Sequence, residues 1–426
     1  MEKVLFKYID EPEQYRIENY IKNGGYRAIQ KVFKDFTPEQ VIETTKQSGV
    51  RGRGGAGFPA GLKWGFVPQN TGKPIYLCCN ADESEPGTCK DRVLMERDPH
   101  MIIEGIMIAS YAINCHHAFV YVRGEFVYPA YRVELAVNEA YEKGYLGKNI
   151  FDSGYDLDIV VHTGGGAYIC GEETSLLSSL EGRRGNSRIR PPFPAVKGLY
   201  GCPTVVNNVE TLASLPSIFN NGVEWYRSHG TEKSPGTKIF SLSGNVNRPG
   251  NYEVDLGTPL SYIINDLGGG IQDSRKLKAI IPGGSSTPLL MPDQIDTPLD
   301  YESMAEAGSM LGSGAIIVID DRACMVWVIM KLMNFYAHES CGRCTPCREG
   351  TVWLKQIINR IENGDGRKGD IELILDICEN IIGRTICPLG DAAVMPTRSI
   401  IEHFRDEFEY HIEHKKCKVK TDYPFV

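Results

Sequence analysis

The chain has 426 residues, a formal net charge of −8 at pH 7 and 42% hydrophobic residues. This length allows about two to four domains, and the negative charge argues against nucleic acid as the main partner. The N-terminus is charged throughout, and the longest apolar runs, AIIVI and CMVWVIM, are too short to span a bilayer, so we expect neither a leader sequence nor a membrane anchor. We therefore expect a soluble protein of a reducing compartment, in which thirteen cysteines indicate metal or redox work rather than disulfides.

The N-terminal half alternates between predicted helices and predicted strands. Residues 12–48 have mixed helical character and lead into a glycine-dense loop, 51–65. Beyond the loop we predict strands at 73–83, 117–126 and 155–164, and helices at 100–115 and 128–147, from the spacing of apolar residues. This alternation predicts a mostly parallel α/β sheet between about 65 and 225.

The composition changes near residue 230. Residues 236–270 contain short strands, turn signals at 247–250 and one helix, which indicates a small, separate α+β module. From about residue 323 the chain is predicted to be helical. Apolar residues there form three stripes that fit a helix bundle: Leu354, Ile357, Ile358 and Ile361; Ile374, Ile377 and Ile381; and Ile401, Phe404 and Phe408.

The stretch ESCGRCTPC, 339–347, carries the most specific chemical signal. Cys341, Cys344 and Cys347 are spaced so that a short loop brings three thiolates to three irons of a cubane cluster. Cys387, which is followed by a proline, is the best candidate for the fourth ligand. Cys378 is the weaker alternative, because it lies in phase with the apolar stripe of its helix. Zinc is the competing metal, although zinc sites more often pair two C-x-x-C units.

The remaining cysteines have no such spacing, and we interpret them as small buried hydrophobic side chains. They are Cys78, Cys79, Cys89, Cys115, Cys170, Cys202, Cys324 and Cys417.

Two glycine-rich loops predict a nucleotide site. Gly52-Arg-Gly-Gly-Ala-Gly57 fits G-x-G-x-x-G, but it follows a predicted helix, whereas the dinucleotide fingerprint follows a strand. We therefore expect a loop whose backbone N–H groups approach a phosphate, with Lys63 as a nearby cation and Phe58 and Phe66 placed to stack on a ring. The alternative is a purely structural turn.

The second loop, 164–182, lies between a predicted strand and a predicted helix, so the helix N-terminus can hold a phosphate. It carries Glu172 and Glu173, and the acidic run 80–92 follows another strand. Carboxylates at strand ends suit the recognition of ribose hydroxyls. The alternatives are a solvated charged surface and, for Glu173, a cap on the following helix.

These motifs closely resemble those of the NADH- and FMN-binding subunit of respiratory complex I, the type I NADH dehydrogenase. The matching stretches are GRGGAGFPAGLKWGF, NADESEPGT, GAYICGEETSLL, PPFPAVKGLYGCPTVVNNVETL, SCGRCTPCREG and ICPLGD, and the resemblance covers nearly the whole chain. It implies a mixed α/β and α+β fold in four parts: an N-terminal segment with the glycine-rich loop, 1–60; a Rossmann-like FMN/NADH-binding domain, 61–229; a ubiquitin-like β-grasp module of SLBB type, 230–322; and a helical bundle that binds a [4Fe–4S] cluster, 323–426.

The resemblance also implies site residues, by motif position. FMN contacts are expected from Gly54, Gly55, Lys63, Asn80, Asp82, Glu83, Tyr168, Gly171, Glu172, Asn207, Asn208 and Thr211. NADH contacts are expected from Phe58, Phe66, Glu85, Glu173, Arg190 and Phe193, with Glu85 near the nicotinamide and no catalytic acid or base. The cluster ligands are expected to be Cys341, Cys344, Cys347 and Cys387.

The implied activity is oxidation of NADH by hydride transfer to non-covalent FMN, followed by single-electron transfer to the cluster and on toward quinone. The implied partners are a thioredoxin-like [2Fe–2S] subunit and a large multi-cluster iron–sulfur subunit. The implied location is the cytoplasmic side of the bacterial inner membrane, with membrane contact only through the complex. The first alternative is a diaphorase subunit of an NAD-dependent hydrogenase or formate dehydrogenase, which usually carries additional cluster modules. The second is a non-catalytic scaffold with a structural zinc.

Overall fold

The first sheet has four parallel strands, β1 (Tyr76–Ala81), β2 (His117–Val122), β3 (Asp158–Thr163) and β4 (Thr204–Asn208), in the order β3-β2-β1-β4. The structure, a computed structural model, describes residues 2–419. Both faces of the inner strand β1 are covered, so three successive residues, Leu77, Cys78 and Cys79, are fully buried. Such runs are typical of strands in a parallel sheet. The mostly parallel sheet that the sequence predicts is confirmed.

Helices on both sides of this sheet include α6 (Pro99–Ala112), which is apolar all round and almost entirely buried. The buried Glu104 of α6 accepts hydrogen bonds from the Tyr20 hydroxyl and the backbone N–H groups of Tyr26 and Ile29, at 2.5–3.1 Å. The N-terminal segment is thereby anchored to the same core. The other helices of this part are α1 (Ile17–Lys22), α2 (Arg27–Asp35), α3 (Pro38–Ser48), α4 (Ala60–Gly65), α5 (Lys90–Arg97), α7 (Val127–Glu142), α8 (Glu173–Leu180), α9 (Pro194–Lys197), α10 (Val209–Ala213), α11 (Leu215–Asn221) and α12 (Val223–Arg227).

The second sheet is mixed and has the order β6-β5-β8-β7. Strands β5 (Thr237–Gly244) and β6 (Gly250–Asp255) form a hairpin, and β7 (Leu277–Ile281) is antiparallel to β8 (Ala315–Asp320). The first and last strands, β5 and β8, are parallel neighbours, which is the β-grasp arrangement. A π-helical turn (Tyr262–Leu267) and α13 (Tyr301–Glu306) complete the module. It has a hydrophobic core of its own, so the predicted separate α+β module is confirmed.

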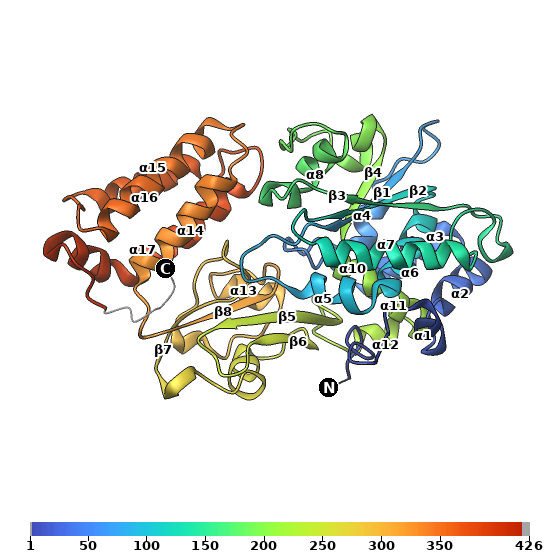
Figure 1. Ribbon diagram of the computed structural model, residues 1–426, viewed down its shortest axis with the longest axis horizontal. Coiled ribbons are helices and arrows are strands. Elements are labelled where there is room, and N and C mark those ends of the chain that lie inside the picture. Colours follow the sequence, from blue (N-terminus) through green and yellow to red (C-terminus); the bar gives the residue numbers. More distant parts are fainter. Residues whose placement is uncertain (1, 420–426) are drawn as a thin grey trace.

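Four helices form the C-terminal bundle: α14 (Met325–Glu339), α15 (Thr345–Glu362), α16 (Asp370–Ile381) and α17 (Leu389–His414). The three predicted stripes are all buried in one core. Figure 1 shows the bundle (orange to red), the second sheet and the first sheet as three distinct bodies, with loops of all three meeting between them. Short 3₁₀ turns cover Ile150–Asp152, Tyr168–Gly171, Leu199–Gly201, Gln272–Ser274 and Pro292–Gln294. Within residues 2–419, no helix has both the length and the apolar character that a bilayer crossing requires.

Candidate functional site

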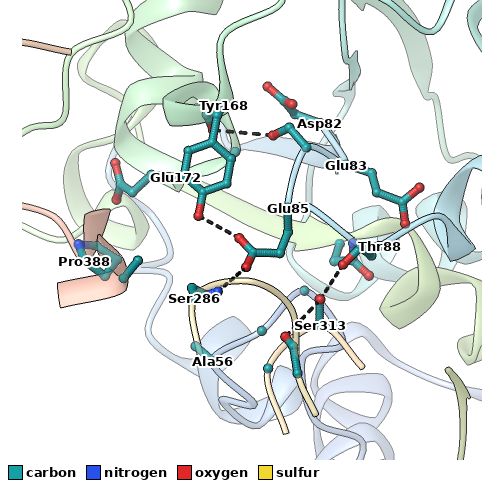
Figure 2. A pocket seen from close by; sticks show the side chains of 18 of the residues that line it. Ala56, Asp82, Glu83, Glu85, Thr88, Tyr168, Glu172, Ser286, Ser313 and Pro388 are labelled. Carbon is teal, nitrogen blue, oxygen red and sulfur yellow. Dashed lines mark hydrogen bonds between the residues drawn. The ribbon is translucent and has the colours of Figure 1, made fainter. Parts of the chain in front are cut away.

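A cavity of about 370 Å³ lies where the three bodies meet, at the carboxyl ends of β1 and β4 (Figure 2). Ligands of parallel α/β sheets bind at this end of the strands. The first body contributes Gly54, Gly55, Ala56, Asn80, Asp82, Glu83, Ser84, Glu85, Thr88, Lys90, Asp91, Tyr168, Ile169, Gly171, Glu172 and Asn208. The β-grasp module contributes Gly283, Ser286, Met310, Gly312 and Ser313, and the bundle contributes Pro388, Leu389, Ala392 and Met395.

Most of the residues expected to contact FMN are brought together here, and Glu85 lies among them. Three are not. Lys63 donates to Glu173 (2.7 Å) and to the Val206 carbonyl (2.8 Å), away from the cavity lining. Asn207 accepts from the Trp64 indole N–H at 2.8 Å, and the Thr211 hydroxyl accepts from the backbone N–H of Arg53 at 2.9 Å. Asn207 and Thr211 therefore hold α4 and the glycine loop in place behind the cavity.

The end of β1 supplies two carboxyl groups with raised pKa values. Glu83 accepts from the backbone N–H groups of Asp91 (2.8 Å) and Arg92 (3.0 Å) at the start of α5. Burial, with the Asp91 charge adding to it, raises the pKa of Glu83 to about 7. Burial also raises the pKa of Asp82 to about 7. The Asp82 Oδ1 atom is buried and has no hydrogen-bond partner within the described residues, so it is available to a ligand.

A buried charge network forms the base of the cavity. The Lys90 ammonium contacts Asp91 (2.7 Å) and Glu210 (2.8 Å), and Asp91 also accepts from the Asn208 amide at 2.7 Å. Lys238 of β5 reaches Glu210 at 3.2 Å and so ties the second sheet to the first. Burial alone would raise the pKa of Glu210, but the Lys238 and Lys90 charges lower it to about 2. Sequence reasoning missed Lys90, although a lysine inside the acidic run 80–92 was a visible signal.

Glu85 joins two of the bodies across the cavity (Figure 2). Its carboxylate accepts from the Tyr168 hydroxyl at 2.7 Å and from the backbone N–H of Ser286 at 2.8 Å. Ser286 belongs to the loop after β7, so this carboxylate fixes the position of the β-grasp module against the first sheet. Sequence reasoning missed the β-grasp and bundle residues of the wall, because no local pattern in them points to a ligand.

The residues expected to contact NADH lie outside the cavity lining, except Glu85. Phe58, Phe66 and Phe193 are 49%, 59% and 57% exposed, and the rings of Phe58 and Phe66 are 6.1 Å apart. Large aromatic side chains held this open to solvent are typical of a binding surface. Glu173 forms ion pairs with Lys63 (2.7 Å) and Arg190 (3.2 Å).

Glu172 is the residue that caps α8. Its carboxylate accepts from the backbone N–H groups of Thr174 and Ser175, each at 3.0 Å. The helix-cap alternative that we considered for Glu173 therefore applies to its neighbour instead.

The four motif cysteines gather in one apolar cluster, together with Cys170 and leucines of α8. Ser340 contacts the Cys347 sulfur at 3.2 Å, and the backbone N–H of Ile386 donates to the Cys344 sulfur at 3.4 Å. Cys378 belongs to a different cluster, inside the bundle, and is fully buried there. The arrangement favours Cys387 as the fourth ligand.

The spacing of these sulfurs also bears on the metal. A single tetrahedral zinc would hold its sulfur ligands about 3.8 Å apart. Within residues 2–419, no trio of the four motif cysteines brings its sulfurs within 4.8 Å of one another, which favours a larger iron–sulfur cluster over one ion. Burial raises the pKa of the Cys347 thiol to about 11, so the positive charge of bound iron is what would keep it a thiolate.

The other cysteines behave as expected only in part. Cys78, Cys79, Cys115, Cys170 and Cys324 are buried, as predicted. The prediction is wrong for three of them, since Cys89 is exposed and Cys202 and Cys417 are half-buried in loops.

The cavity fits a flavin mononucleotide. Gly55 has φ +140°, and a Cβ added there would meet no atom within 4 Å, so the glycine leaves room for a ligand to approach the backbone. The cavity volume lies within the range of about 300–1,000 Å³ that is usual for cofactor sites. The unpartnered Asp82 oxygen suits a ribityl hydroxyl, and the Lys90 cation supplies positive charge on the same wall.

Three protein-family models match the chain. Residues 45–217 match the Nuo51 FMN-binding domain, residues 239–290 match the SLBB domain, and residues 327–411 match the NADH-ubiquinone oxidoreductase-F iron-sulfur binding region.

Relatives match over almost the full length. The F subunit of NADH-quinone oxidoreductase from Mycobacterium tuberculosis is 55% identical over 420 residues, which cover 97% of this chain and 94% of the relative. The F 2 subunit of the Rhizobium meliloti enzyme is 50% identical over 416 residues, 98% and 99% of the two chains. Among solved structures, a chain of the H2-reduced NAD+-reducing [NiFe]-hydrogenase aligns with a TM-score of 0.85 and 34% identity over 97% of this chain and 67% of that chain. The chain therefore belongs to the family of F subunits of NADH-quinone oxidoreductase.

Proposed function

We propose that this chain oxidises NADH at an FMN held in the cavity and passes the electrons singly to a [4Fe–4S] cluster and on toward quinone. The observation that carries the proposal is the adjacency of the two sites. Pro388 and Leu389 line the cavity, and they directly follow Cys387 of the cysteine cluster. A cofactor in the cavity would thus be a close neighbour of the cluster.

We assign the flavin contacts to the cavity residues Gly54, Gly55, Asn80, Asp82, Glu83, Tyr168, Gly171, Glu172 and Asn208, and we add Lys90. Lys63, Asn207 and Thr211 act from behind the lining, through their contacts with Glu173, Trp64 and the glycine loop. The cluster ligands are Cys341, Cys344, Cys347 and Cys387.

We assign NADH to the open side of the cavity. Phe58, Phe66 and Phe193 offer exposed rings for stacking. Glu173, held by Lys63 and Arg190, presents a carboxylate to the ribose hydroxyls. Glu85 lies at the cavity wall, where its hydrogen bonds from Tyr168 and Ser286 fix it beside the expected position of the nicotinamide.

When bound, FMN supplies the acceptor for a hydride and releases its two electrons one at a time. The residues of the chain orient and enclose the reacting rings. The Glu85 carboxylate accepts from the Tyr168 hydroxyl, the backbone N–H of Ser286 and the Ser285 hydroxyl, which fix its orientation at the cavity wall. Hydride transfer to a flavin needs no protein acid or base.

The family places this chain in a multisubunit complex. We propose a thioredoxin-like [2Fe–2S] subunit and a large multi-cluster iron–sulfur subunit as its neighbours, on the cytoplasmic side of the bacterial inner membrane. We also propose that the chain is divided at residues 60, 229 and 322. The two sheets and the bundle fall within the last three parts, and the N-terminal segment packs on the first sheet.

The second candidate is a diaphorase subunit of an NAD-dependent hydrogenase or formate dehydrogenase. It is favoured by the 34% identity to a chain of an NAD+-reducing [NiFe]-hydrogenase, but the relatives from NADH-quinone oxidoreductases are more similar and match nearly end to end. Isolation of the native complex separates the two. Membrane-bound NADH:quinone reductase activity supports the first, and a complex with hydrogenase or formate dehydrogenase activity supports the second.

The proposed chemistry is tested on the isolated chain with an artificial electron acceptor such as ferricyanide. We expect a yellow-brown protein that oxidises NADH, loses this activity when the flavin is removed and regains it with FMN but not with riboflavin. A colourless protein with tightly bound zinc and no NADH oxidation would support the scaffold alternative instead.

A further inference from the structure

A second group of potential metal ligands lies at the other end of the helical bundle from the cysteine cluster. Cys324 precedes α14, His411 lies in the last turn of α17, and Cys417 follows that helix. Their ligand atoms all lie within 4.8 Å of one another. Cys324 and His411 are fully buried. Helices α14, α15 and α17 are neighbours in the bundle, so residues far apart in the sequence meet at one place (Figure 1).

The His411 ring is oriented as a metal-binding histidine would be. Its Nδ1 lies 2.7 Å from the backbone carbonyl of Glu407, so Nδ1 carries the proton and donates it to that oxygen. The Nε2 lone pair then faces the Cys324 sulfur, at 3.6 Å. Metal-bound histidines nearly always donate their other ring N–H to a carbonyl or carboxylate in this way.

Glu362, the last residue of α15, brings a carboxylate oxygen close to two members of this group. Its Oε2 lies 3.4 Å from His411 Nε2 and 3.9 Å from the Cys324 sulfur. A tetrahedral zinc with bonds of about 2.3 Å to sulfur and about 2.1 Å to nitrogen and oxygen separates sulfur from nitrogen by about 3.6 Å, nitrogen from oxygen by about 3.4 Å and sulfur from oxygen by about 3.6 Å. The three separations among Cys324, His411 and Glu362 match this geometry to within a few tenths of an ångström, and the Cys417 sulfur lies within 4.8 Å of the ligand atoms of Cys324 and His411.

An ordinary ion pair explains the same contacts less well. If His411 were doubly protonated and paired with Glu362, a charge-assisted hydrogen bond of about 2.7–2.9 Å would be expected, whereas the atoms are 3.4 Å apart. The two thiols, Cys324 and Cys417, would have no role in such a pair.

We propose that one zinc ion binds at this tail site, with Cys324, His411 and Cys417 as its ligands and the Glu362 carboxylate beside them. Mixed thiolate and imidazole ligands with tetrahedral separations are typical of structural zinc. The ion would join the start of α14, the last turn of α17 and the segment after α17. Helix α14 alone separates this site from the cluster by about 22 Å, at 1.5 Å per residue. Zinc has no redox chemistry, so the tail site stabilises the bundle and takes no part in electron transfer.

The proposal does not depend on the proposed function, and metal analysis of the holoprotein tests it. We expect about one zinc per chain in addition to about four irons. Cys417→Ser and His411→Ala should each lower zinc at least tenfold and leave iron and flavin unchanged. Cys417→His, which keeps a zinc-binding side chain, should retain most of the metal.

Cys202→Ser is the matched control, because Cys202 and Cys417 are both half-buried in loops. The Cys202 thiol donates to the Tyr200 carbonyl, and the Cys417 thiol donates to the Val419 carbonyl. The Cys202→Ser protein should bind as much zinc as the wild type. X-ray absorption at the zinc edge should show two sulfur neighbours and two nitrogen or oxygen neighbours. Four sulfur neighbours would mean that zinc had replaced the iron cluster, and the proposal would be wrong. It would also be overturned by zinc-free wild-type protein, by equal zinc in Cys417→Ser, or by a disulfide between Cys324 and Cys417 in peptide mass analysis.

Discussion

Glu172 and Glu173 are adjacent in the chain but have different surroundings. Glu172 caps α8 and faces the cavity, whereas Glu173 is held between Lys63 and Arg190 outside it. The structure therefore separates a helix-capping carboxylate from a carboxylate that is paired with two cations, a distinction that the sequence alone left open.

At the residue scale, we predict that Glu173→Gln raises kcat/KM for NADPH and changes that for NADH much less. A carboxylate repels the 2′-phosphate of NADPH, and we expect it to discriminate by about 1–3 kcal/mol, or roughly tenfold to a hundredfold. Removing the charge also leaves Lys63 and Arg190 free to meet that phosphate. Steady-state kinetics with both nucleotides measure the ratio.

Glu172→Ala serves as the comparison, because it removes the cap of α8 and should cost about 1 kcal/mol of stability. An unaltered NADH/NADPH ratio in Glu173→Gln, together with a loss of stability as large as in Glu172→Ala, would contradict the assignment of Glu173 to the ribose.

Asp82 predicts a pH dependence of stability. Burial raises its pKa to about 7 in the folded chain, whereas an unfolded aspartate titrates near about 4. The folded state thus favours the protonated form. The contribution of Asp82 to the free energy of unfolding is therefore largest below about pH 4. It falls by up to about 4 kcal/mol as the pH rises from about 4 to about 7.

We therefore expect the melting temperature of flavin-free protein to fall from pH 5 to pH 8, and to fall less steeply in Asp82→Asn. Glu83 titrates in the same direction and remains in both proteins, so the difference between the two slopes reports Asp82. Equal slopes would show that the Asp82 carboxyl is already hydrated in the flavin-free chain.

At the scale of the elements, the sequence predicted what is locally encoded. The strands β1, β2 and β3 and the helices α6 and α7 have clear apolar periods, and the three stripes of the bundle are buried where expected. The Cys387 assignment also follows from a local pattern, and its position beside the other three cysteines agrees with it.

What the sequence could not predict depends on contacts between elements that lie far apart in the chain. Ser286 and Ser313 of the β-grasp loops and Ala392 of α17 are ordinary small residues that become part of a ligand site only through packing. The cysteines at the tail site are separated by most of the bundle, so no spacing rule connects them.

The adjacency of cluster and cavity sharpens a prediction about the cysteines. Cys344→Ser should remove the EPR signal of the reduced cluster and leave FMN bound, because residue 344 lies in the loop before α15 and does not line the cavity. Cys387→Ser should also remove the cluster but weaken FMN binding, since Pro388 and Leu389 would shift with it.

Cys378→Ser is the matched control, because this thiol is buried in the other core and should be needed for neither cofactor. Iron analysis, flavin fluorescence after extraction and EPR on the three variants provide the measurements. A cluster that survives in Cys387→Ser but disappears in Cys378→Ser would reverse the ligand assignment.

At the scale of the whole molecule, the cavity exists only because three bodies meet. Glu85 is the clearest link, since it holds the β-grasp loop through Ser286 and the first body through Tyr168. Glu85→Ala would leave these donors, and the Ser285 hydroxyl, without this acceptor, at a cost of about 1–3 kcal/mol. We expect a lower melting temperature and a weaker affinity for FMN.

Glu85→Gln keeps an amide oxygen that can still accept part of these hydrogen bonds, so it should show a smaller loss of melting temperature and of FMN affinity. Thermal unfolding and flavin titration measure the two effects. If Glu85→Ala lowered neither quantity, the β-grasp module would not depend on this carboxylate for its position.

The central claim is that the cavity and the cysteine cluster convert a two-electron donor into a one-electron relay. Anaerobic titration of the purified holoprotein with NADH tests it most directly. The flavin takes two electrons and the cluster one, so the wild-type chain should be fully reduced by about 1.5 equivalents of NADH, and Cys344→Ser by about 1.0. Flavin bleaching at about 1.0 equivalent in both proteins, with no cluster EPR signal in the wild type, would contradict the account.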